Sequence, residues 1–96
     1  MNPYVLYPST RKDKRYTVYV PKKDTLIKVD FGSPAYDNYT IHRDARRKQQ
    51  YQQRHKNDRL NDPYSAGFWS WYVLWNTPSL RESFSDATVR AHQLIK

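Results

Sequence analysis

An almost uninterrupted run of aromatic and aliphatic residues in the last third of the chain most constrains its fold. Between Phe68 and Trp75, Ser70 is the only polar side chain that is not aromatic. Each buried aromatic side chain removes roughly 150–250 Å² of surface from water, so such a run favours burial. Its length and periodicity fit a short buried helix or a short buried strand equally well. The run therefore predicts a packed core in a chain of 96 residues, which is long enough for one small domain.

The charged residues are concentrated in the other part of the chain. The chain has 17 Lys and Arg against 9 Asp and Glu, a formal net charge of +8. Residues 60–96 are neutral overall, whereas residues 41–59 alone carry seven Lys and Arg against two Asp. A chain that is only 38% hydrophobic and this basic resembles a disordered one by composition. Because the aromatic run argues against disorder, the charge indicates a surface used for binding.

Two stretches of alternating side chains predict a β-hairpin. Residues 15–20 and 25–31 are rich in β-branched and aromatic residues. Residues 21–24 predict a four-residue turn led by Pro21, and residues 32–34 end the second strand. A lone hairpin is marginally stable in water, so a helix or another chain must pack against it. The side chains expected to share a face within each strand are Tyr16, Val18 and Val20, and Ile27, Val29 and Phe31.

Residues 41–58 predict an exposed basic helix. They contain no Gly or Pro and are mostly good or neutral helix formers. We expect Thr40 to cap a helix over residues 42–56, with Asp44 near its positive end. Because the apolar side chains form no sustained face, this helix is expected to face solvent or a partner.

The C-terminal residues show the clearest helical periodicity. A cap is available in two ways: Thr77 followed by Pro78 at the first helical position, or Ser79 with Glu82 as a capping box. The apolar side chains then recur at helical spacing and predict one buried face. These side chains are Leu80, Phe84, Ala87, Ala91, Leu94 and Ile95.

The first residues predict an extended arm, because Pro3 and Pro8 disfavour helix within residues 1–14. The predicted fold class is therefore α+β. We expect a small single domain over residues 15–96, in which the β-hairpin, the basic helix and the C-terminal amphipathic helix pack with the Trp-rich segment. The extended N-terminal arm precedes this domain.

The basic segment is the first candidate site, for an anionic partner. Its cations could contact phosphates while Tyr51 stacks on a base, or they could contact an acidic protein surface. Protein contact is the favoured interpretation, because no zinc-finger, RRM or helix-turn-helix motif is complete. The candidate residues are Arg43, Arg46, Arg47, Lys48, Tyr51, Arg54, Lys56 and Arg59.

The aromatic residues form a second candidate site, and two compatible interpretations apply to them. In a chain this poor in Leu and Ile they are expected to form the core. Exposed Trp and Tyr beside Arg are also enriched at protein interfaces. The residues assigned to core or protein interface are Tyr4, Tyr7, Phe68, Trp69, Trp71, Tyr72 and Trp75.

Residue types that catalysis and metal binding require are scarce. The absence of Cys excludes disulfides and thiolate sites, and two Gly are too few for a glycine-rich phosphate loop. The three His lack the i, i+4 spacing of helical metal ligands. We expect no catalytic residue, metal or cofactor, with a nuclease using His42 and His55 as a remote alternative. No transmembrane segment is expected, and the first residues lack the apolar core of a signal peptide.

Three joined motifs point to a family. They are residues 38–44 (NYTIHRD), the basic stretch ending in Arg54-His55, and residues 66–76 (AGFWSWYVLWN). In combination they resemble a group of small basic uncharacterised proteins encoded by large nucleocytoplasmic DNA viruses. The resemblance extends over residues 15–85 and transfers no catalytic residue.

The resemblance implies a non-enzymatic virion structural protein, synthesised in the host cytoplasm and located in the capsid. We expect a minor capsid protein that cements or links major capsid protein, other minor capsid proteins or inner layers. The arm and the hairpin edge would pair with neighbouring chains, and the basic helix would face acidic capsid surfaces or, peripherally, the inner membrane. The alternative is a basic nucleic-acid-binding protein associated with the viral genome.

Overall fold

The structure, a computed structural model, describes residues 2–95, and its sheet is built around the predicted hairpin. Strands β2 (Tyr16–Lys22) and β3 (Thr25–Phe31) pair antiparallel along their whole length. The prediction of a four-residue turn is wrong, because Pro21 continues β2 and only Lys23 and Asp24 connect the strands. Lys23 has a φ of 55°, the positive value that two-residue hairpin connections require.

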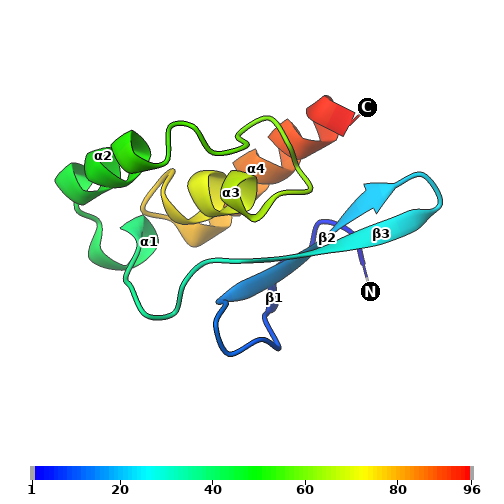
Figure 1. Ribbon diagram of the computed structural model, residues 1–96, viewed down its shortest axis with the longest axis horizontal. Coiled ribbons are helices and arrows are strands. Elements are labelled where there is room, and N and C mark those ends of the chain that lie inside the picture. Colours follow the sequence, from blue (N-terminus) through cyan, green and yellow to red (C-terminus); the bar gives the residue numbers. More distant parts are fainter. Residues whose placement is uncertain (1, 96) are drawn as a thin grey trace.

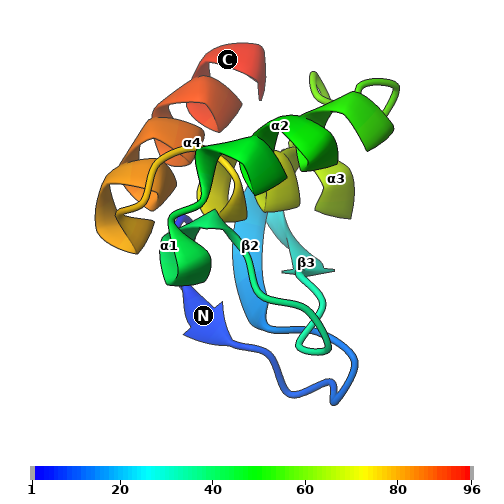
Figure 2. The same cartoon turned by 90° about the vertical axis from the view of Figure 1, so that its left-hand side faces the viewer.

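The N-terminal segment adds a third strand to this sheet. Strand β1 (Tyr7–Pro8) pairs antiparallel with β2, which gives the order β1-β2-β3. The N–H of Tyr4 donates a hydrogen bond to Tyr19 O at 3.0 Å, and the Tyr4 side chain packs against the core. Part of the predicted arm therefore lies against its own sheet (Figure 2). Met1 and Lys96, the outer ends of the predicted arm and domain, lie outside the described residues.

A polar contact on the sheet holds the β1–β2 connection in place. The hydroxyl groups of Thr17 and Ser9 both donate to the Asp30 carboxylate, the latter at 3.0 Å. Burial alone would raise the pKa of Asp30, but these hydrogen bonds and the cations of Lys28 and Arg11 outweigh it, so the pKa is lowered. Asp30 thus links three segments of the sheet through its charged form.

The predicted basic helix is divided in two. Helices α1 (Tyr39–His42) and α2 (Ala45–Arg54) are separated at Arg43, whose φ of 55° breaks the helical path. The side chain of Asp44 accepts from backbone N–H groups of the first turn of α2 and is its N-cap, so the assignment of Thr40 as the cap is wrong. A carboxylate there gains hydrogen bonds and a favourable interaction with the helix dipole.

The aromatic run is helical rather than extended. It forms α3 (Ala66–Trp69), which continues as a π-helical turn, η1 (Ser70–Leu74). Ser65 caps α3 by accepting a hydrogen bond from the Phe68 N–H at 3.3 Å. Trp75 follows this turn, and its ring stacks on Tyr51 of the basic helix.

Helix α4 (Leu80–Ile95) packs against η1 and begins at the second of the two predicted caps. The N–H of Glu82 donates to Ser79 Oγ at 3.2 Å. The predicted buried face needs one correction, because Leu94, near the end of the helix, is 47% exposed. Ser83 is fully buried on this face instead, where its hydroxyl accepts from the Thr77 N–H at 3.0 Å.

The core lies between the sheet and the helices, and the predicted α+β class is confirmed. Helices α3 and α4 lie on the same side of the sheet, and α2 lies at the end opposite the hairpin turn (Figure 1). Trp69 is fully buried at the centre, where its Nε1–H donates to Pro63 O at 2.6 Å. The buried apolar residues are Val18, Val20, Val29, Phe31, Phe68, Trp69, Val73, Leu74, Ala87 and Ala91.

Lowering the pH should remove the contribution of Asp30 to stability. Because its pKa is lower in the folded chain than in the unfolded chain, this contribution is present above the unfolded pKa and is lost as the pH falls through the folded pKa. The free energy of unfolding should therefore fall less steeply in Asp30→Asn than in the unsubstituted protein between about pH 5 and pH 2. Urea unfolding followed by circular dichroism measures both slopes, and equal slopes would contradict the role of Asp30.

Candidate functional site

Most of the predicted anion-binding side chains form an exposed patch, here called the basic surface. They come from the α1–α2 junction, from α2 and from the loop that follows it. Within residues 2–95 only Arg59 of this set makes an ion pair, with Asp62 at 3.9 Å. The basic surface is therefore largely uncompensated and suited to an anionic partner. It consists of Arg43, Arg46, Arg47, Arg54, Lys56 and Arg59.

Two residues of the predicted set, Lys48 and Tyr51, turn inward instead. Lys48 Nζ donates to Asn76 O at 2.6 Å and lies 5.0 Å from the ring centroid of Tyr39. Its ammonium group therefore joins α2 to α1 and to the chain after η1. Both contacts of Lys48 are with residues of its own domain, so this side chain helps to hold α2 in place.

Tyr51 is buried between two other rings, so the expectation that it stacks on a base is wrong. Its ring centroid lies 4.3 Å from that of Trp75, and the two ring planes are nearly parallel, with an angle of 2° between them. The ring centroid of His55 lies 4.1 Å away, with an angle of 23° between the ring planes. Its hydroxyl donates to Ser70 Oγ at 3.0 Å, and burial raises its pKa. The side chain is only 7% exposed, and both faces of the ring are covered. Its role is to attach α2 to η1.

The predicted aromatic set separates into core and edge. Phe68 and Trp69 are fully buried. Tyr4, Tyr72 and Trp75 are partly buried and pack against the core. The other two are half-buried, and each lies against an aromatic neighbour. The ring centroids of Tyr7 and Tyr19 are 6.0 Å apart, and those of Trp71 and Tyr51 are 6.1 Å apart.

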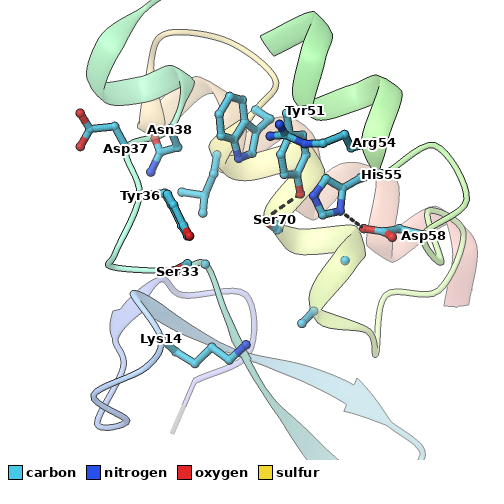
Figure 3. A pocket seen from close by; sticks show the side chains of 15 residues that line it. Lys14, Ser33, Tyr36, Asp37, Asn38, Tyr51, Arg54, His55, Asp58 and Ser70 are labelled. Carbon is cyan, nitrogen blue, oxygen red and sulfur yellow. Dashed lines mark hydrogen bonds and ion pairs between the residues drawn. The ribbon is translucent and has the colours of Figure 1, made fainter. Parts of the chain in front are cut away.

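A cleft of about 550 Å³ lies between the β3–α1 loop and the end of α2, and the sequence interpretation missed it (Figure 3). Both glycines of the chain line it. Gly32 has a φ of 84° and turns the chain away from β3, and Gly67 lies against Asp58. In a chain with only two glycines, their positions on either side of the basic helix were the available signal.

One wall of the cleft is fixed by Arg15. Its guanidinium donates to Ser33 O at 3.1 Å and to Tyr36 O at 2.8 Å, across the β3–α1 loop. At the end of this loop, Asn38 is buried and caps α1 by accepting from the Thr40 N–H at 3.0 Å. The loop therefore has an anchor near each end, and the cleft is largely preformed.

The polar groups of the cleft carry both signs of charge. His55 Nδ1 is paired with Asp58 Oδ2 at 2.9 Å, which fixes the orientation of the imidazole. Lys14 and Arg54 lie on opposite sides of the cleft in Figure 3. Neither cation makes an ion pair with another residue in the described part of the chain. The floor is apolar and includes Leu74.

The two histidines of the nuclease alternative lie at opposite ends of an aromatic stack. His42 lies 5.3 Å from Trp75, Trp75 stacks on Tyr51, and Tyr51 stacks on His55. The structure therefore does not bring His42 and His55 together. Across residues 2–95, no group of three or more acidic or histidine side chains is placed to hold a metal ion.

A model described as a family of unknown function (DUF5754) matches residues 4–55, which contain the sheet, α1 and α2. No curated protein and no solved structure matches. None of the helices within residues 2–95 has the length and apolarity needed to cross a membrane.

Removing the ring of Tyr51 should loosen α2 while the sheet stays folded. Tyr51→Ala eliminates both ring contacts and should speed hydrogen exchange of the α2 amides, measured by mass spectrometry. Tyr51→Phe retains the stack and loses only the bond to Ser70, so it should cost about 0.5–1.5 kcal/mol in the free energy of unfolding. Unchanged α2 exchange in Tyr51→Ala would contradict this role.

Proposed function

The chain belongs to this family of unknown function (DUF5754), since the match covers more than half of the chain. We propose that the protein is a non-enzymatic structural protein of a virion. In this proposal it acts as a minor capsid protein that joins major capsid protein to other minor or inner-layer proteins. The resemblance of residues 15–85 to proteins of large DNA viruses supports the viral part of the proposal.

The observation that carries the binding role is the basic surface. Five of its six cations make no ion pair with another described residue, and all six are exposed. Such a surface attracts anionic partners over a screening length of about 8 Å at physiological ionic strength. An acidic patch on a neighbouring capsid protein has the matching chemistry.

Two features favour a protein partner over nucleic acid. Sequence-tolerant binding of single strands depends on aromatic rings that bases can stack on, whereas Tyr51, in the middle of the basic helix, is covered on both faces. In addition, no strand within residues 2–95 pairs with the outer edge of β3. An open strand edge is a site where an extended segment of a neighbouring chain can add by main-chain hydrogen bonds.

Particle fractionation tests the proposal. Purified particles of the encoding virus are opened, treated with nuclease and separated into shell and soluble fractions, and the protein is quantified by mass spectrometry. We expect it to remain with the shell, because its contacts are with protein. Release together with the genome fragments would favour the nucleic-acid alternative, and absence from the particles would overturn both.

Charge reversal supplies a matched control for this test. Arg46→Glu with Arg47→Glu changes the basic surface and should reduce retention in the shell. Lys23→Glu with Arg81→Glu makes the same change in net charge on exposed residues outside the basic surface, and should leave retention unchanged. Equal loss in both double variants would show that net charge alone, rather than this surface, is responsible.

Binding to the viral genome is the second candidate, favoured by the concentration of unpaired Arg and Lys within residues 43–59. If five or six phosphates are contacted, log K should fall against log salt with a slope of about −5. Electrophoretic mobility shift assays with double- and single-stranded DNA over a salt series measure this slope. Weak binding that is insensitive to Arg46→Glu with Arg47→Glu would exclude this candidate.

A further inference from the structure

We propose that the cleft between the β3–α1 loop and α2 binds an acidic peptide segment of a partner protein, with one apolar side chain of that segment seated on the cleft floor. The cleft is distinct from the outer part of the basic surface, which includes Arg46 and Arg47, and only Arg54 belongs to both. The inference rests on the proposed function in one respect: both assign an acidic protein as the partner.

The size and the floor of the cleft fit one side chain and a short stretch of backbone. A volume of about 550 Å³ falls within the range of roughly 300–1,000 Å³ for sites that hold ligands. Leu74 and Trp75 supply an apolar floor, and Tyr36, 74% exposed, adds an aromatic ring at the edge. Exposed aromatic rings beside an arginine are the residue types that dominate binding energy at protein interfaces.

The charges of the cleft fit acidic side chains on either side of that apolar anchor. Lys14 and Arg54 lie across the cleft from one another in Figure 3, and neither is neutralised by another described residue. Arg54 also ends α2, where a cation is stabilised by the negative end of the helix dipole and stays available for an anion. A peptide with carboxylates flanking an apolar residue would meet both cations at once.

A nucleotide fits the same cleft less well. Asp37 is one of the residues that line the cleft, and its carboxylate can accept hydrogen bonds from peptide N–H groups, which the phosphates of a nucleotide do not supply. Both ring faces of Tyr51 are covered, by Trp75 and His55, so this ring offers no open face on which a base could stack. An acidic peptide carries N–H groups that can donate to Asp37 and carboxylates that can pair with Lys14 and Arg54.

The cleft is preformed, which favours a short and specific segment. The two hydrogen bonds from Arg15 hold the β3–α1 loop, and the His55–Asp58 pair holds the opposite wall. A site whose walls are already ordered loses less conformational entropy on binding. Affinity can then come from few contacts.

The test selects ligands directly from a displayed library of random peptides, using the full chain. We expect enriched sequences in which acidic residues flank an apolar residue. Synthetic copies of the enriched peptides are then measured by fluorescence anisotropy. Lys14→Glu with Arg54→Glu should weaken their binding by about tenfold or more, because both cations become repulsive. Tyr36→Ala removes a side chain that is 74% exposed, and it should weaken binding without any change of charge.

The control is Lys23→Glu with Arg81→Glu, which makes the same change in net charge outside the cleft and should keep full affinity. Enriched peptides without acidic residues, or equal losses in the cleft and control variants, would overturn the proposal. Binding of a single-stranded DNA oligonucleotide that competes with the peptides and is lost in the cleft variant would also overturn it, by assigning the cleft to nucleotides.

The outcomes separate this inference from the proposed function. Peptide binding as expected, in a protein that is absent from purified particles, would sustain the cleft and refute the virion role. Retention in the capsid shell with no peptide binding at the cleft would sustain the virion role and refute the peptide site.

Discussion

The stack of Tyr51 between Trp75 and His55 is the contact on which the functional half of this molecule depends. Helix α2 has 10 residues, is strongly polar, and buries Tyr51 alone. A helix this short is marginal in water without tertiary packing. One buried aromatic residue, supported by its hydrogen bond to Ser70, therefore fixes where the basic surface and one wall of the cleft lie.

The same arrangement explains how a chain this basic folds. Its Arg side chains point outward from α2, where water screens their mutual repulsion, and Lys48 has its charge satisfied by a carbonyl group. The core uses none of these residues and consists of strand Val and Phe side chains packed on Trp69 and the helices above the sheet. The Arg residues of α2 and the residues of the core thus come from different segments, so the core buries none of these charges.

Local patterns predicted the elements well where the physics is local. Alternation in β2 and β3 identified the packed face, and α4 begins at one of the two caps that the sequence offered, Ser79 with Glu82. Prediction failed where two local preferences competed. Asp44 is a stronger helix cap than Thr40, and the left-handed conformation of Arg43 separates one expected helix into two. Pro21 was expected in a turn and instead continues a strand that pairs with β3.

The site was less predictable, because side chains far apart in the sequence build it. The sequence alone determined that residues 43–59 concentrate positive charge and that the aromatic run contributes to the core, since charge density and apolar density are properties of the segments themselves. Only the tertiary structure decided that Tyr51 faces inward and that Lys14, Gly32, Arg54 and Gly67 line one cleft. The physical reason is that α2 buries a single apolar side chain, Tyr51, and the direction in which this side chain faces is set by the ring on which it stacks. That ring belongs to Trp75, a residue outside α2, so the helical periodicity of α2 cannot reveal it.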